Sequence, residues 1–274
     1  MKIKDILMSN NQHMLLPGII GQDPSIHKLA KKIKKVAFSD RPVLLNGATG
    51  TGKELFANAI HELSHREGNM VAVNCSAIPE HLFESLLFGH EKGAFTGAFK
   101  RQHGYFSQAN NGTLFLDEIA ELPLVHQPKL LRVLETKCYS RIGSDEKIQF
   151  DGRIITATHA NLLEMTKQKL FREDLYYRLN IFELDIPSLE DRREDIPLLV
   201  NFFSQQNEKV TFSQCALELL KFSSWPGNIR QLKNTVDKLC VMADSDFLSA
   251  ECIQSMANCD QDEELIFKIA RDLI

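Results

Sequence analysis

The stretch PVLLNGATGTGKELFANAIHELSH, residues 42–65, decides the fold of this protein. Its first part, PVLLN at 42–46, is a short apolar run of the kind that forms a buried β-strand. The glycine-rich GATGTGKE at 47–54 follows directly, and KELFANAIHELSH at 53–65 has the apolar spacing of a helix. A strand, a glycine-rich loop and a helix in this order match the G-x-x-x-x-G-K pattern of a phosphate-binding loop.

The glycines of this loop indicate an anion site. They let backbone N–H groups turn toward a phosphate, and the N-terminus of the following helix adds positive potential. Lys53 is then expected to meet the β- and γ-phosphates of a nucleotide. We therefore predict that the loop binds ATP through Gly47, Ala48, Thr49, Gly50, Thr51, Gly52, Lys53 and Glu54.

One position of the loop departs from the general pattern. Glu54 stands where Ser or Thr usually offers a hydroxyl to Mg²⁺, so a carboxylate from elsewhere has to serve the metal. The run TLFLDEI at 113–119 delivers Asp117 and Glu118 to the carboxyl edge of the sheet, where ligands of open α/β sheets bind. We predict that Asp117 holds Mg²⁺ through water and that Glu118 orients and deprotonates the attacking water.

Working outward, further β-like runs alternate with helix-like stretches such as QPKLLRVLETK at 127–137. This alternation predicts an α/β fold with a parallel sheet covered by helices on both faces. The additional β-like runs are MVAVNC at 70–75, TLFLDE at 113–118, RIITAT at 153–158 and IFELDI at 181–186.

The β-like pattern stops after PSLEDRREDIP at 187–197, and the remaining stretches have helical spacing. A small helical domain is therefore expected after the α/β domain. The helical stretches are LLVNFFSQQNE at 198–208, SQCALELLKFSS at 213–224, NIRQLKNTVDKLCVMA at 228–243 and SAECIQSM at 249–256. The expected parts are a leader at 1–16, the α/β domain at 17–188, the helical domain at 189–257 and a tail at 258–274.

The composition excludes several classes of protein. The chain has 274 residues, 43% hydrophobic and 25% charged, which is typical of a globular protein. Its net charge of −4 does not support a broad nucleic-acid-binding face. The six cysteines form no C-x-x-C pair and no zinc spacing. Since no apolar window is long enough to span a membrane and the start lacks the features of a signal peptide, we expect a cytoplasmic protein without membrane contact.

The stretch GHEKGAFTGAFKRQ at 89–102 predicts a loop rather than a helix or a strand. Phe95 stands among small residues and glycines, which offer little to pack and cost backbone entropy on ordering. We therefore expect a loop whose tip contacts a partner.

Together these stretches resemble the AAA+ ATPase domain of bacterial enhancer-binding proteins, the activators of sigma-54 RNA polymerase. GATGTGKE, GAFTGA at 93–98 and GTLFLDEI at 112–119 match the phosphate loop, the signature loop and the acidic strand of that family. FREDLYYRLNIFELDIPSL at 171–189 and WPGNIRQLKN at 225–234 match two further stretches. The resemblance, from about residue 17 to 257, implies an AAA+ P-loop three-layer sandwich with a parallel central sheet, followed by a small all-helical lid domain.

The resemblance also implies roles for single residues. Asn74 would hold Glu118 in an inactive pose until ATP arrives, Thr158 would sense the γ-phosphate, and Arg230 would touch the nucleotide from the lid. His159 stands where the family typically has Asn. A second nucleotide-associated segment corresponds to Ala109, Asn110, Asn111, Gly112, Thr113, Leu114, Phe115, Leu116, Asp117 and Glu118. The loop that would contact sigma, chiefly through its Phe and Thr, consists of Gly93, Ala94, Phe95, Thr96, Gly97 and Ala98.

Arg172 and Arg178 match the arginines that the family offers to the ATP of a neighbouring subunit. Six residues apart on a helix, they would point about 120° from each other, and we expect them to have different roles. Local ion pairs with Glu173 and Asp174 are the alternative interpretation of these arginines.

The resemblance implies an ATP-hydrolysing activator with ATP and Mg²⁺ as cofactors, assembled into a ring that we expect to be a hexamer. Its partners would be sigma-54 and the RNA polymerase holoenzyme, whose closed promoter complex it would remodel. The leader is too short for a sensory domain, and the tail resembles only the start of a DNA-binding domain, so DNA binding by this chain itself is not expected. Two alternatives stay open: a nucleotide-dependent binding module or adaptor without productive hydrolysis, and a general AAA+ machine such as a helicase loader.

Overall fold

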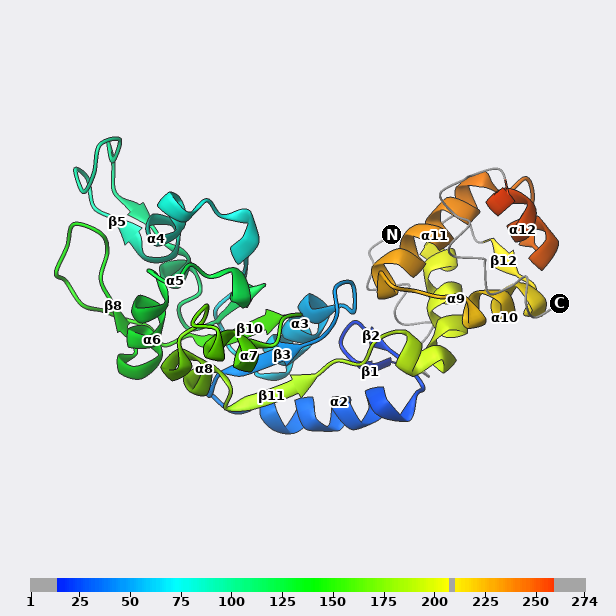
Figure 1. Ribbon diagram of the computed structural model, residues 1–274, viewed down its shortest axis with the longest axis horizontal. Helices are drawn as coiled ribbons and strands as arrows, with labels where there is room; N and C mark the ends of the chain where they lie inside the picture. Colours follow the sequence, from blue (N-terminus) through cyan, green and yellow to red (C-terminus); the bar gives the residue numbers. More distant parts are fainter. Residues whose placement is uncertain (1–13, 207–209, 259–274) are drawn as a thin grey trace. The chain divides into compact units, whose positions relative to one another are not determined.

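The computed structural model describes residues 14–206 and 210–258 of the chain (Figure 1). Most of the predicted leader and nearly all of the predicted tail therefore lie outside the described residues. The chain divides into two compact units. We call Lys32–Gly47 with Lys53–Asp185 the α/β unit, and the described residues of Met1–Lys31, Ala48–Gly52 and Ile186–Ile274 the helical unit.

A five-stranded sheet forms the centre of the α/β unit. Its order is β11-β3-β10-β7-β4, and every neighbouring pair is parallel. The residues of β3, β7 and β10 are almost all buried, as expected for central strands covered on both faces. The predicted α/β fold with a parallel sheet is thus confirmed. The strands are β3 (Val43–Asn46), β4 (Met70–Asn74), β7 (Thr113–Asp117), β10 (Arg153–Thr158) and β11 (Phe182–Asp185).

Helices and short 3-10 turns connect and cover these strands. Apolar residues from several of these elements form a core with the sheet, in which Phe83, Phe106 and Phe150 are fully buried. The helical elements are α2 (Pro24–Val36), which begins in the helical unit, α3 (Lys53–Leu63), η1 (Cys75–Ala77), α4 (Glu80–Phe88), α5 (Tyr105–Gln108), η2 (Ile119–Glu121), α6 (Gln127–Thr136), α7 (Leu162–Lys167) and α8 (Glu173–Leu179).

A buried arginine ties the sheet to the end of α2. Arg153, the first residue of β10, is fully buried and donates hydrogen bonds to the carbonyl oxygens of Ala37, Val36 and Arg41 at 2.9, 3.0 and 3.2 Å. Burial lowers the pKa of its guanidinium to about 10. The carbonyl groups that follow a helix end are left without helical partners, and Arg153 satisfies them here.

Two antiparallel strand pairs extend the α/β unit beyond the sheet. One pairs β5 (Gly89–His90) with β6 (Gln102–His103), and the other pairs β8 (Cys138–Tyr139) with β9 (Ile148–Gln149). Figure 1 shows the loop that follows β5 projecting from the α/β unit.

The helical unit packs four helices around Trp225, which is buried and donates from Nε1 to the carbonyl oxygen of Leu220 at 2.8 Å. The predicted helical lid is confirmed. The elements are η3 (Glu190–Asp195), α9 (Ile196–Gln206), α10 (Gln214–Phe222), α11 (Asn228–Met242) and α12 (Ala250–Asn258).

Two short strand pairs in this unit differ from the expectation. A parallel pair, β12 (Thr211–Phe212) with β13 (Phe247–Leu248), joins the helices, and two-residue strands are too short to show an alternating pattern. Residues 14–16, expected in the leader, form β1 (Met14–Leu16) and pair with β2 (Ile19–Ile20), because Leu16 and Ile19 are buried. Across the two described segments, the helices lack the length and apolar character needed to cross a membrane.

Candidate functional site

The loop between β3 and α3 has the backbone of a phosphate cradle. Gly50 and Gly52 have φ values of +79° and +92°, which glycine adopts without the penalty that a Cβ brings. The N–H of Gly47 donates to the carbonyl oxygen of Thr158 at 3.2 Å, so the start of the loop is fixed to the neighbouring strand β10. Lys53 follows as the first residue of α3, in the order that the sequence predicts.

The ammonium group of Lys53 lies between Gly47 and the residue that follows β7. Its Nζ donates to the carbonyl oxygen of Gly47 at 3.0 Å and lies 3.6 Å from Oε1 of Glu118. The Lys53 side chain is 6% exposed and that of Glu118 is 16% exposed. The structure thus brings together the two residues that the sequence assigned to the phosphates and to the attacking water.

Glu118 has an unusual backbone. It directly follows β7 with φ +50° and ψ +52°, the left-handed conformation that is costly for residues other than glycine. Its N–H donates to Oδ1 of Asp117 at 3.0 Å. Its second carboxylate oxygen, Oε2, lies 2.7 Å from Nδ1 of His159, the residue that follows β10. Both oxygens of Glu118 therefore face cationic or donating side chains.

Asn74 makes a different contact from the predicted one. It lies opposite Asp117 in the parallel register of β4 and β7, but its Oδ1 accepts from the N–H and hydroxyl of Ser76 at 2.9 and 2.7 Å and caps η1. The side chain hydrogen-bonded to Glu118 is His159 instead. The sequence flagged His159 only as a departure from the family; knowing that β10 and β7 are neighbours would have placed it beside Glu118.

The carboxyl edge of the sheet carries the carboxyl groups of Asp117 and Glu118. Burial, with contributions from Asp117 and Glu118, raises the pKa of the Cys75 thiol to about 12. Within residues 14–206 and 210–258, no group of three or more His, Cys, Asp or Glu side chains could hold a metal by itself. Such an edge suits Mg²⁺, which is commonly bound through one or two carboxylates together with water and substrate phosphates.

The predicted second nucleotide segment does not join this cluster. Residues 109–113 lie at the amino end of β7, about 13 Å along the strand from Asp117 at 3.3 Å per residue. There the N–H of Thr113 donates to the carbonyl oxygen of Asn69, and Asn111 has φ +59°. Leu114, Phe115 and Leu116 are buried inside the sheet. From this segment only Asp117 and Glu118 lie at the edge with Lys53, because a strand carries its two ends to opposite edges.

The two arginines are not on one helix, which corrects the predicted angle between them. Arg172 precedes α8 with extended backbone (φ −76°, ψ 133°), and Arg178 lies inside the helix. The guanidinium of Arg172 donates twice to Asp174, at 3.0 and 2.7 Å, and lowers the pKa of that carboxyl group. Arg178 donates to the carbonyl oxygen of Leu134 at 3.1 Å. The Arg172–Asp174 pair is half-exposed, and exposed pairs of this kind are weak enough to exchange partners.

Within the helical unit, residues 48–52 pack against the start of α11. The carbonyl oxygen of Gly50 accepts from the backbone N–H of Arg230 at 3.2 Å, whereas the Arg230 side chain is exposed. A Cβ on Gly50 would lie 2.1 Å from the carbonyl oxygen of Gly227. Asn228 donates from Nδ2 to the carbonyl oxygen of Thr49 at 2.9 Å and therefore fixes the loop, a contact that the sequence did not suggest.

The hexapeptide at 93–98 forms a closed turn between β5 and β6. The N–H of Gly93 donates to the carbonyl oxygen of Ala98 at 2.8 Å, and Gly93 and Gly97 have φ values of +82° and +105°. The Phe95 ring is 43% exposed and packs edge-on against His90, with 4.9 Å between ring centroids. Thr96 is exposed. The predicted loop therefore presents its Thr to solvent while its Phe rests on the β5 strand.

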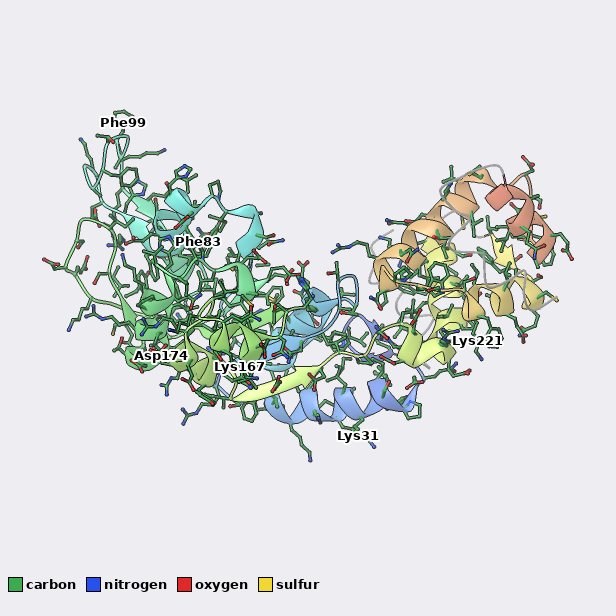
Figure 2. The ribbon with its side chains drawn as sticks, viewed as in Figure 1. Lys31, Phe83, Phe99, Lys167, Asp174 and Lys221 are labelled. Atoms are coloured by element: carbon green, nitrogen blue, oxygen red, sulfur yellow. The ribbon has the colours of Figure 1, made fainter. Side chains whose placement is uncertain are left out.

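Phe99 is the most exposed aromatic side chain of this projection. It is 85% exposed, and Figure 2 shows it at the outer end of the loop. The base of the loop is held by backbone hydrogen bonds of 3.0 Å from Glu91 to Ile142 and from Ile142 to Gly89. Glu91 also forms an ion pair with the buried Arg141 at 3.0 Å. The base is thus fixed to the segment between β8 and β9, whereas the Phe99 ring extends into solvent.

Comparison with known proteins places these features in a family. The family model of the Sigma-54 interaction domain matches residues 19–185, and that of the AAA+ ATPase lid domain matches residues 190–264. The regulatory protein AtoC of Escherichia coli (strain K12) is 48% identical over 240 residues, which is 85% of this chain and 52% of AtoC. The DNA-binding transcriptional regulator NtrC of Rhizobium meliloti (strain 1021) is 44% identical over 258 residues, 92% of this chain and 53% of NtrC. The chain therefore spans about half the length of the curated relatives it matches.

Solved structures agree with the sequence comparison. The crystal structure of NtrX from Brucella abortus in complex with ATP matches with a TM-score of 0.78 and 36% identity, covering 85% of this chain and 53% of that one. A RuvB variant of Thermotoga maritima matches with a TM-score of 0.59 and 18% identity over 91% of this chain and 75% of that one, which supports the fold alone. Because both family models match consecutive parts of its two-unit fold, the chain belongs to the Sigma-54 interaction domain family of AAA+ P-loop proteins found in sigma-54-dependent transcriptional activators.

Proposed function

We propose that this chain hydrolyses ATP and uses that reaction to remodel sigma-54 RNA polymerase through the loop at 93–98. The observation that carries the proposal is the short distance of 3.6 Å between Lys53 Nζ and Glu118 Oε1. A lysine for the phosphates and a carboxylate for the water are the two groups that phosphoryl transfer to water requires from a protein. NtrX, a relative by structure, was solved with ATP and with ADP, which supports the same ligand here.

Binding of the nucleotide would draw Lys53 away from Gly47 and Glu118 toward the β- and γ-phosphates. The loop N–H groups and the N-terminus of α3 would hold the remaining phosphate charge. Mg²⁺, when bound, would neutralise the charge on the phosphates, with Asp117 holding it through water.

Hydrolysis would then depend on Glu118. Its carboxylate takes a proton from a water molecule as the water oxygen bonds to the γ-phosphorus and the bond from that phosphorus to the ADP oxygen breaks. Glu118 is 16% exposed and lies 3.6 Å from Lys53, which supports a role in activating a water on the phosphate side. Thr158, which ends the neighbouring strand, would sense the γ-phosphate; its hydroxyl accepts from the N–H of Ala160 at 3.0 Å, which leaves the hydroxyl hydrogen for another acceptor.

A ring of subunits, expected to be a hexamer, would complete the site. Arg172 is half-exposed and bonded to Asp174 on the surface of the α/β unit, where a neighbour could recruit it. An arginine supplied in this way contributes on the order of a thousandfold or more to the rate of phosphoryl transfer. Turnover per subunit is therefore expected to rise with protein concentration.

The loop at 93–98 would contact the sigma factor and couple ATP hydrolysis to its remodelling. Its glycines allow the turn to open, its tip is exposed, and its base is fixed to the α/β unit. Thr96 and Phe95 would contact the partner once the Phe95 ring leaves His90.

The proposal is tested by phosphate release and by open-complex formation at a sigma-54 promoter, with ATP and with a slowly hydrolysed analogue. The wild type should be active in both assays with ATP and inactive with the analogue. Lys53→Ala should be inactive in both assays. Lys167→Ala, on the exposed surface of α7, is the matched control and should behave as wild type. ATP binding without phosphate release at any protein concentration would refute hydrolysis and favour a binding module.

A further inference from the structure

We propose that His159 is a positioning residue for hydrolysis, which holds one oxygen of Glu118 so that the other faces the phosphates. The inference rests on the proposed ATPase function and adds to it a residue with a stated task. It assigns a role to a residue that the family resemblance left without one.

The contact itself is short and its chemistry is defined. Nδ1 of His159 lies 2.7 Å from Oε2 of Glu118. An ionised carboxylate can only accept, so Nδ1 has to carry the hydrogen. Hydrogen bonds to a charged acceptor are about twice as strong as those between neutral groups.

The fold fixes the donor in place. His159 follows β10 directly, and β10 is hydrogen-bonded to β7, the strand that ends before Glu118. Thr158 is fully buried, and its hydroxyl accepts from the N–H of Ala160 at 3.0 Å, so the backbone on both sides of His159 is held. The imidazole therefore projects from a rigid point beside Glu118.

The two oxygens of Glu118 have different partners, and this difference gives the contact its function. Oε2 faces His159, while Oε1 faces Nζ of Lys53 at 3.6 Å. When Lys53 turns to the phosphates, Oε1 loses its partner and is left on the phosphate side, while Oε2 stays bonded. The carboxylate then presents one basic oxygen in one orientation, as a general base requires.

Without His159, rotation of the Glu118 side chain would be less restricted. The left-handed backbone of Glu118 and its N–H bond to Asp117 fix the main chain but leave the side-chain torsions free. Asn74, the other polar side chain at this edge that we expected to hold Glu118, is bonded to Ser76. The orientation of the Glu118 carboxylate before the reaction therefore depends on the imidazole of His159.

The competing interpretation is that His159 only supports the fold. In that case its replacement would lower the unfolding midpoint. The side chain of His159 is 49% exposed, so its removal leaves no cavity in the core. We expect the loss to appear in turnover and to leave the unfolding midpoint unchanged.

The first experiment measures kcat and KM for ATP at protein concentrations at which the wild-type rate per subunit no longer rises. His159→Ala and His159→Phe remove the donor, and kcat should fall about tenfold, since a hydrogen bond to a charged group is lost at a half-exposed site. KM should stay within about twofold, because binding of the ground state does not use this bond. His159→Asn and His159→Gln keep a donor, and at least one of them should recover part of the loss. His27→Ala, an exposed histidine on α2, is the matched control.

The second experiment detects the contact without catalysis. In protein labelled with ¹⁵N-histidine, the ring nitrogens of His159 should show the hydrogen on Nδ1, and Glu118→Ala should change this pattern. The inference is overturned if His159→Ala keeps the wild-type kcat, or if Glu118→Ala leaves the His159 ring signals unchanged. A wild type without turnover would overturn the proposed ATPase and this role with it, whereas the two former results leave the ATPase intact.

Discussion

Replacing Arg153 with methionine should destabilise the α/β unit by about 3 kcal/mol. Arg153 is fully buried and donates to the carbonyl oxygens of Val36, Ala37 and Arg41 at 3.0, 2.9 and 3.2 Å. Methionine fills a similar volume but donates no hydrogen bond. The carbonyl oxygens of Ala37 and Arg41 lose the bond from Arg153, and that of Val36 keeps only the bond from the N–H of Ser39 at 3.0 Å.

The magnitude follows from two opposing contributions. Three hydrogen bonds from a charged donor contribute about 1.5–3 kcal/mol each, or about 4–9 kcal/mol in total. Burial opposes them: it lowers the pKa of Arg153 from 12.5 to about 10, which corresponds to about 3 kcal/mol against the charged form. The remainder, about 3 kcal/mol, is a large part of the roughly 5–15 kcal/mol that stabilise a typical domain.

The assay is urea unfolding followed by far-UV circular dichroism. With a slope of about 2 kcal/mol per molar urea, the midpoint should fall by about 1.5 M. The single tryptophan, Trp225, is buried in the helical unit, so its fluorescence follows that unit separately. Arg132→Met, at an exposed position of α6, is the matched control. An unchanged or higher midpoint for Arg153→Met would show that desolvation cancels the hydrogen bonds, and the reasoning would be wrong.

Three further predictions concern the loop and the pH dependence of stability. Thr96→Ala should keep most of the ATPase activity but abolish open-complex formation at a sigma-54 promoter; a parallel loss of both activities would contradict a separate contact loop. Phe99→Ala removes the 85% exposed ring and should weaken capture of sigma-54 about tenfold with unchanged phosphate release, whereas Phe38→Ala, 73% exposed on another surface, should change neither. Burial lowers the pKa of His61, whose Nδ1 lies 2.9 Å from the hydroxyl of Thr113. The unfolded chain therefore binds the proton more tightly, and stability should be lost as pH falls below the ordinary pKa of 6.5. His61→Gln should flatten this dependence when urea midpoints at about pH 8 and about pH 5.5 are compared; an equal slope in both proteins would argue against His61.

The fold and the main residues of the candidate site were predictable because they depend on short stretches of chain. The run RIITAT at 153–158 is apolar and β-branched, and it forms a strand buried on both faces. The glycine loop follows a strand and opens a helix, so the place of Lys53 is set by local geometry alone. The same holds for Glu118, since a residue that follows a parallel strand has to emerge at the carboxyl edge.

The contacts between these residues depended on the tertiary structure. The pairing of Glu118 with His159 requires β7 and β10 to be neighbours, and the order β11-β3-β10-β7-β4 cannot be read from one strand. Asn74 is bonded to Ser76 because η1 begins there. This local hydrogen bond competes with the expected contact to Glu118, and the family resemblance does not reveal it.

The sequence by itself determined the α/β fold, the helical unit and the positions of Lys53 and Glu118, since periodicity and turn residues act over a few neighbouring positions. Only the tertiary structure decided that the start of β7 lies at the other edge of the sheet, that Arg172 pairs with Asp174, and that His159 holds Glu118. Side chains choose partners by distance in space, and packing of the strands brings together residues that are 41 positions apart in the chain.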